Sequence, residues 1–164
     1  MAVSPHYSLF AVELFQMILF HWTKADAGRF EREGIEMLIE ACSAKIHQAK
    51  VTNAVLDYVG SITIDEEILE ACGMLPLQYV NITNISNGVF WRTYIMPGKR
   101  GDRDICLNGP PAHHFQKGDR IIILAEVWLE PKDIGDLELT VVVLNEFNEI
   151  IETIKKKAIS SPKA

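Results

Sequence analysis

The sequence has few cysteines, no basic stripe and no hydrophobic run of membrane-spanning length. Its three cysteines, Cys42, Cys72 and Cys106, are odd in number and lack a CxxC spacing. This excludes a disulfide framework or a zinc ribbon and predicts reduced thiols in a cytoplasmic protein. With a net charge of −6 and no basic stripe, the chain is a poor candidate for nucleic-acid binding. Motifs for nucleotide, zinc and serine-hydrolase chemistry are absent, so we expect no metal.

The longest apolar segment, residues 7–22, is too short for a membrane helix. It has 16 residues and contains Glu13 and Gln16, whereas a spanning helix needs about 20 mostly apolar residues. No Lys or Arg precedes it and no small-x-small cleavage site follows it, so it makes a poor signal peptide. We expect no membrane partner and interpret the segment as an amphipathic helix or as a part outside the working protein.

The 164 residues suffice for one domain with its own core. Residues 37–127 are dense in strand signals separated by turn residues. Six strands are predicted there, over residues 45–51, 61–64, 80–85, 90–95, 104–107 and 120–126. By contrast, residues 128–164 have mixed character and end in a polar tail.

Two local signals refine this pattern. Asn87-Gly88 between two apolar runs predicts a β-hairpin. Asp65 can cap a short helix that ends near Gly73. Many short strands with one or two short helices favour a mainly β fold, a closed or nearly closed barrel.

Several motifs in a fixed order carry a family resemblance over residues 37–127. They are KIHQAKVT (45–52), YVGSITID (58–65), NG (87–88), TY (93–94), RG (100–101), ICLNG (105–109) and GD (118–119). Together they closely resemble the pyruvoyl-dependent aspartate 1-decarboxylases, also called aspartate α-decarboxylases. The resemblance implies a double-psi β-barrel over residues 37–164, preceded by an N-terminal extension over residues 1–36.

The resemblance also implies a zymogen that cleaves its own backbone between Gly60 and Ser61, giving residues 1–60 and 61–164. A serine hydroxyl held against the preceding carbonyl can attack it, because both groups belong to one strained turn. Glycine suits that turn since it tolerates backbone geometry that other residues resist. Elimination and hydrolysis then leave a covalent pyruvoyl group at Ser61, which in the family forms a Schiff base with the substrate amine.

The implied reaction converts L-aspartate to β-alanine and carbon dioxide, which supplies pantothenate and coenzyme A. The family further implies a homotetramer with sites shared between subunits, and no added metal. Whether cleavage is spontaneous or needs a maturation factor stays open. One alternative is the same chemistry on a different, less acidic amino acid, and another is a barrel that never matures and serves as a binding module.

The family's supporting residues carry over onto matching positions. Tyr94 matches the tyrosine that returns a proton to the substrate carbon, a role that suits a phenol. Thr93 matches the threonine that assists cleavage near the scissile carbonyl, and Asn108 matches an asparagine lining the site; both also contact substrate in the family. Tyr58 and His47 match positions near the cleavage turn whose roles are less defined.

The expected substrate-binding residues include one departure from the family pattern. Lys45 matches a lysine near the substrate carboxylate, and Gly109 follows the site asparagine. Where the family has an arginine that grips a carboxylate, this chain has Phe90. Losing such a pair weakens binding of a diacid by roughly 1.5–3 kcal/mol. Arg92 shares a strand face with Phe90 and either replaces the missing arginine or is a surface residue.

A second departure is the pair Pro110-Pro111, which stands where the family has alanines. Proline lacks a backbone N–H, so two donors are missing. Both departures remove hydrogen-bond donors from the polar end of the expected pocket. They motivate the hypothesis that the pocket prefers a less acidic amino acid.

The family's own sequence starts where Met37 stands. The residues just before it, Glu31 to Gly34, can be encoded by purine-rich codons, as at a ribosome-binding site. We therefore hypothesise that Met37 is the natural start. The alternative is a genuine helical appendage.

Overall fold

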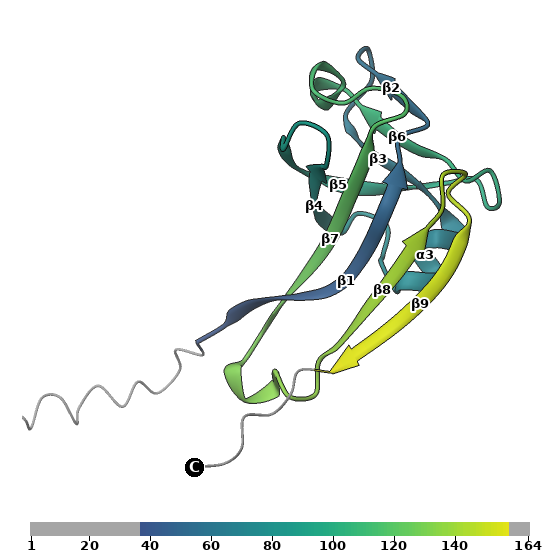
Figure 1. Ribbon diagram of the computed structural model, residues 1–164. Helices are drawn as coiled ribbons and strands as arrows, with labels where there is room; N and C mark the ends of the chain where they lie inside the picture. Colours follow the sequence, from purple (N-terminus) through teal and green to yellow (C-terminus); the bar gives the residue numbers. More distant parts are fainter. Residues whose placement is uncertain (1–36, 158–164) are drawn as a thin grey trace, which may run out of the picture. The chain divides into compact units, whose positions relative to one another are not determined.

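The computed structural model describes residues 37–157 (Figure 1). The interpretations of residues 1–36, including the apolar segment 7–22, lie outside the described residues. Within residues 37–157, no helix is long and apolar enough to cross a membrane. All three cysteines belong to the described part and are free thiols there.

Nine strands of the described residues form one mixed sheet in the order β2-β6-β3-β5-β4-β7-β1-β8-β9. The strands are β1 (Ile39–Lys50), β2 (Asn53–Val55), β3 (Ser61–Asp65), β4 (Tyr79–Asn84), β5 (Phe90–Gly98), β6 (Ile105–Asn108), β7 (Arg120–Leu129), β8 (Glu138–Leu144) and β9 (Ile150–Lys157). Three neighbouring pairs are parallel, namely β1–β8, β2–β6 and β3–β5, and the others are antiparallel. Parallel neighbours need crossover connections, and this crossed, mainly β architecture agrees with the expected double-psi β-barrel.

The predicted helix is present as α3 (Glu66–Cys72). Asp65 caps it by accepting a hydrogen bond from the backbone N–H of Glu67 at 2.8 Å. Gly73 ends it in the left-handed conformation, with φ of 73°. The other helical segments of the described chain are short 3₁₀ turns, η1 (Pro110–His113) and η2 (Pro131–Asp133).

The predicted hairpin joins β4 to β5, which pair antiparallel up to Thr83 and Phe90. Gly88 has a φ of 73° and donates its N–H to the Asn84 carbonyl at 2.9 Å. This left-handed conformation favours glycine because a Cβ would crowd the carbonyl oxygen that follows it in the chain. The hairpin sets the register of β5, which carries four of the expected site residues.

Three strands of the described chain were not predicted, namely β2, β8 and β9. β2 has three residues, too few to show an alternating pattern. β9 contains Ile150, Ile151 and Ile154 but ends in Lys155 to Lys157. It lies at the edge of the sheet beside β8, so only one flank is paired and most of its side chains are exposed. β8 carries the run Val141 to Val143, a strand signal that the mixed composition of the segment concealed.

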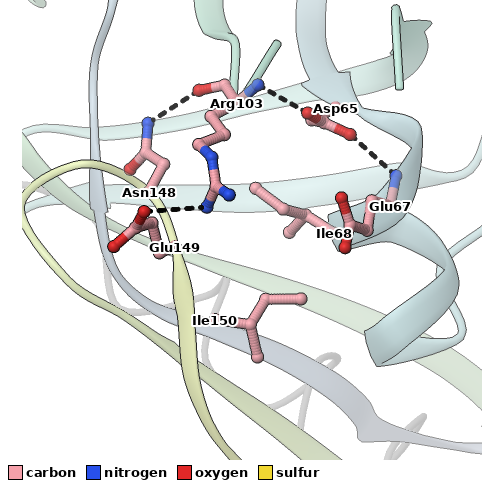
Figure 2. Close-up of a pocket in the computed structure, with 7 residues that line it drawn as sticks. All are labelled: Asp65, Glu67, Ile68, Arg103, Asn148, Glu149 and Ile150. Carbon is pink, nitrogen blue, oxygen red and sulfur yellow. Dashed lines mark hydrogen bonds and ion pairs between the residues drawn. The ribbon is translucent and has the colours of Figure 1, made fainter. Parts of the chain in front are cut away.

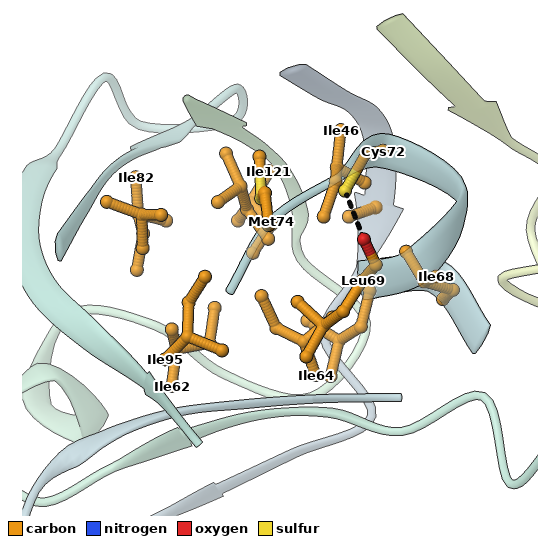
Figure 3. Packing of buried hydrophobic residues seen from close by; sticks show 14 of the residues in the cluster. Ile46, Ile62, Ile64, Ile68, Leu69, Cys72, Met74, Ile82, Ile95 and Ile121 are labelled. Carbon is orange, nitrogen blue, oxygen red and sulfur yellow. Dashed lines mark hydrogen bonds between the residues drawn. The ribbon is translucent and has the colours of Figure 1, made fainter. Parts of the chain in front are cut away.

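Isoleucine is the most frequent residue of the buried core, and most of the core isoleucines lie on strands (Figure 3). Ile62 and Ile64 of β3 and Ile95 of β5 are fully buried and meet Leu69 and Cys72 from α3. Each such side chain stabilises the fold by about 1.5–3 kcal/mol. Because strand side chains alternate, burying Ile62 and Ile64 commits Ser61 and Thr63 to the opposite face of β3.

Candidate active site

The expected cleavage turn has an unusual backbone conformation. Gly60 has a φ of 99°, and Ser61, the first residue of β3, has a φ of 108°. A positive φ is uncommon for a residue with a side chain and is typical of strained functional turns. Ser61 is nevertheless 2% exposed, so its hydroxyl is held in place and shielded from bulk water.

Asn108 at the end of β6 contacts the Ser61 hydroxyl directly. The two residues are opposite each other in the antiparallel β3–β6 ladder. The Asn108 Nδ2 group donates to Ser61 Oγ at 3.3 Å and to Thr63 Oγ1 at 2.9 Å. Asn108 is itself 3% exposed, so this amide is a fixed donor beside residue 61.

Gly109 allows the segment after β6 to approach the cleavage turn. Its N–H donates to the Val55 carbonyl at 2.7 Å, and its φ is 79°. A Cβ at this position would lie 3.0 Å from Gly60 Cα and 3.1 Å from the Tyr58 carbonyl oxygen. Only glycine fits this approach. The backbone of Tyr58 borders Gly109, and Tyr58 as a residue is 54% exposed.

Thr93 and Tyr94 are consecutive on β5 and face opposite sides of the sheet. Thr93 is opposite Val80 and buried on the core side with Ile95, and no hydrogen bond links it to Gly60 or Ser61 in the described chain. The parallel ladder of β3 and β5 begins at Ile62 and Ile95, one residue beyond Ser61 and Tyr94. The Tyr94 ring packs edge-to-face against Tyr79, with 6.2 Å between the ring centroids.

Arg92 contacts an acidic and an aromatic side chain on the outer face of the sheet. Its guanidinium lies 4.0 Å from the Glu40 carboxylate and 5.7 Å from the Tyr79 ring centroid. A side-chain hydrogen bond with Glu126 raises the pKa of Glu40, while the charge of Arg92 lowers it. Phe90 shares this face and is 60% exposed. Arg92 thus already has a carboxylate partner within the chain.

Lys45 and His47 are on β1, which three strands separate from β3. Within residues 37–157, no hydrogen bond joins either side chain to Gly60 or Ser61. Burial lowers the pKa of the His47 imidazole, and the positive charge of Lys45 lowers it further. The His47 Nδ1 atom is buried without a partner in the described part. One chain alone does not bring these two residues to the turn.

The prolines after Gly109 occupy the first positions of η1. An N–H at the start of a helix has no partner within that helix, so proline costs nothing there. Pro111 is also buried. The missing donors of Pro110-Pro111 are therefore compatible with the local backbone.

Two contacts of the site were not predicted, those of Thr63 and Cys106 with Asn108. The available signal is the alternation in the segments SITID and ICLN. It places polar side chains at 61 and 63 on one strand face and at 106 and 108 on the next. Strand pairing, which the sequence does not show, brings these four side chains together.

A separate hollow of about 290 Å³ lies beside α3 (Figure 2). Its lining residues are Asp65, Glu67, Ile68, Arg103, Asn148, Glu149 and Ile150. Its polar groups bind one another: Asp65 accepts from the Glu67 and Arg103 backbone N–H groups, and Asn148 donates to the Arg103 carbonyl. None of the expected site residues lines it, so the cleavage turn remains the candidate site.

Comparison with known proteins shows the family of the chain. The family model described as aspartate decarboxylase matches residues 37–151. A protein of Sulfurimonas denitrificans named aspartate 1-decarboxylase is 49% identical over 119 residues, which cover 73% of this chain and 98% of that protein. Its namesake from Carboxydothermus hydrogenoformans is 46% identical over 123 residues, covering 75% and 96%. The Bacillus subtilis protein of that name is 49% identical over 108 residues, covering 66% and 85%.

The fold and the matches first define a class, the small β-barrel carboxy-lyases. Within that class, the chain belongs to the aspartate decarboxylase family. The family match spans the strands that carry the cleavage turn, Asn108 and Tyr94, which confirms the family expected from the sequence motifs.

Proposed function

We propose that this chain is a proenzyme that cleaves itself between Gly60 and Ser61 and then converts L-aspartate to β-alanine and carbon dioxide. The observation that carries the proposal is the turn itself. Two consecutive residues have positive φ, and the buried Ser61 hydroxyl accepts a hydrogen bond from Asn108. The names of the relatives, each called aspartate 1-decarboxylase, support the substrate.

The cleavage needs only groups of the chain and water. Ser61 Oγ attacks the carbonyl carbon of Gly60, the C–N bond breaks, and an ester and a free amine form. Loss of the Ser61 α-proton then expels Gly60 as a carboxylate. Water finally replaces the nitrogen of residue 61, which leaves as ammonia, and a pyruvoyl group remains. Confinement in one turn promotes the first step because it fixes the two reacting groups together.

The surroundings of residue 61 fit such a group. The Asn108 Nδ2 atom is already aimed at the oxygen of this residue, and it can donate to a carbonyl oxygen there. When formed, the pyruvoyl group supplies a carbonyl that takes up the substrate amine and accepts the electron pair left by carbon dioxide. In this proposal Tyr94 returns a proton to the substrate carbon, and Lys45 attracts the substrate carboxylate.

We further propose a homotetramer with sites shared between subunits. Lys45 and His47 are three strands from the turn in the sheet, so a neighbouring subunit is the natural source of these side chains. Large apolar residues on the outer face, including Tyr79 at 59% and Phe90 at 60% exposure, support an interface there.

A specific observation favours a second candidate, the same chemistry on a less acidic amino acid. Phe90 replaces the expected arginine, and Arg92 is paired with Glu40 and Tyr79. No free guanidinium is then left on the described part of β5 to grip a second carboxylate. Kinetics with a panel of amino acids distinguish the two: a far higher kcat/KM for aspartate than for neutral or apolar amino acids would reject the second candidate.

The first test is the intact mass of the purified chain under denaturing conditions. We expect two fragments divided between residues 60 and 61, the larger with a pyruvoyl end. A single chain that remains whole after heating, and after incubation with a candidate maturation factor, would favour the binding module instead.

A further inference from the structure

The orientation of the Asn108 amide is fixed from both sides. Its Nδ2 group donates to Thr63 Oγ1 at 2.9 Å and to Ser61 Oγ at 3.3 Å. Its Oδ1 atom accepts from Cys106 Sγ at 3.2 Å. Neither end of the amide is left to water, since Asn108 is 3% and Cys106 is 7% exposed.

Strand pairing explains why these four side chains meet. Ser61 is opposite Asn108, and Thr63 is opposite Cys106, in the antiparallel ladder of β3 and β6. Residues two apart share a strand face, so the two pairs stack side by side. The amide of Asn108 reaches across to Ser61, diagonally to Thr63, and back along its own strand to Cys106.

This arrangement matters because an amide has a donor end and an acceptor end. With Oδ1 toward residue 61, Asn108 could no longer donate to an oxygen there. The Cys106 S–H group donates to Oδ1 and would face an N–H group instead if the amide were reversed, so Cys106 favours the observed orientation. The Thr63 hydroxyl accepts from the other end and holds the donor group within reach of Ser61.

We infer that Cys106 and Thr63 are positioning residues for self-cleavage, which turn the NH₂ group of Asn108 toward residue 61. They act through Asn108 and make no contact with the scissile bond. By holding the donor, they restrain the Ser61 hydroxyl in the turn where it must meet the Gly60 carbonyl. The inference rests on the proposed function, because it concerns the rate of the same cleavage.

The test compares paired variants in the full-length chain. Cys106→Ala removes the donor, whereas Cys106→Ser keeps a donor of similar size. Likewise, Thr63→Val removes the acceptor, and Thr63→Ser keeps it. The fraction cleaved between residues 60 and 61 is followed by intact mass against time. Loss of one hydrogen bond is expected to slow cleavage by roughly threefold to tenfold in Cys106→Ala and in Thr63→Val, with rates near wild type in both serine variants.

To separate folding from cleavage, each substitution is also combined with Ser61→Ala, which keeps the chain uncleaved. Thermal unfolding of these uncleaved chains reports stability apart from cleavage. A Cys106→Ala chain that cleaves at the wild-type rate would overturn the inference, as would a Cys106→Ser chain as slow as Cys106→Ala. If Cys106→Ala fails to fold, the Thr63 pair decides by the same criteria. A wild-type chain that never cleaves would overturn the proposed function and, with it, this inference.

Discussion

At the cleavage turn, a missing side chain decides how closely two distant segments approach. Gly109 comes so near to Gly60 that a Cβ would lie 3.0 Å from the Gly60 Cα. The 48 residues between them place the contact beyond any local pattern, although Gly60 and Gly109 were both expected at the site. The turn geometry therefore depends on Gly109 as much as on Gly60 and Ser61.

Gly109→Ala should slow self-cleavage by roughly tenfold to a hundredfold, because the turn must move to admit the methyl group. Gly101→Ala is the matched control. Gly101 also has a positive φ, 82°, but its added Cβ would meet nothing within 4 Å. Both variants should lose about 1–2 kcal/mol of stability from backbone strain, and only Gly109→Ala should cleave slowly by intact mass. Equal cleavage rates would contradict a role for the close approach.

The His47 imidazole should make the stability of the fold depend on pH. Burial, with the charge of Lys45, holds its pKa below the usual value near 6.5. The contribution of His47 to stability is therefore fully present at pH values above the pKa that this imidazole has in the unfolded chain. As the pH falls, the unfolded chain takes up the proton first, and stability is lost until the pH passes below the folded pKa.

His47→Gln should therefore reduce the difference in unfolding free energy between neutral and mildly acidic solution. Urea unfolding of the wild type and the variant at both pH values measures this. The wild type should lose more stability on acidification than the variant does. An equal loss in both chains would show that His47 does not titrate in this way.

Among the elements, α3 and the loop after β5 are tied together by one carboxylate. Asp65 is 1% exposed. It accepts hydrogen bonds from the backbone N–H groups of Glu67, Gly101 and Arg103. The sequence showed its role as a helix cap, because capping is local. It could not show the bonds to residues 101 and 103, which depend on the fold.

Asp65→Ala should lower the free energy of unfolding by about 3 kcal/mol, since it removes the helix cap and two further hydrogen bonds to backbone N–H groups. Asp65→Asn keeps one acceptor oxygen for the cap and should lose about 1 kcal/mol. Chemical denaturation of both variants in the uncleaved Ser61→Ala background provides the comparison. If Asp65→Ala were as stable as the wild type, the carboxylate would not be what joins α3 to the loop.

At the scale of the whole molecule, the buried core of residues 37–157 consists of residues that follow Met37. The buried cluster runs from Ala44 to Leu144, with Ile150 packed against it, and the family match starts at residue 37. We propose Met37 as the natural start. The mass of the smaller cleavage fragment from the native source would decide between Met1 and Met37.

A chain that starts at Met37 should unfold at the same temperature as the full-length chain and cleave to the same extent. The physical reason is that the buried cluster of the described residues lies within Ala44 to Leu144, after Met37. Thermal unfolding and intact mass, measured side by side on the two chains, provide the check. Failure of the shorter chain to fold or cleave would instead support a genuine N-terminal appendage.

The sequence by itself determined the six main strands, the α3 helix, the β4–β5 hairpin and the family. These features depend on period-two alternation, on a capping carboxylate and on turn glycines, which act within a few residues. Only the tertiary structure decided which side chains meet. Strand register decides three such contacts. They are the approach of Gly109 to Gly60, the ion pair of Arg92 with Glu40 and the hydrogen bond from Cys106 to the Asn108 amide. Register is set by packing of the shared core across the sheet, and a linear pattern does not record it.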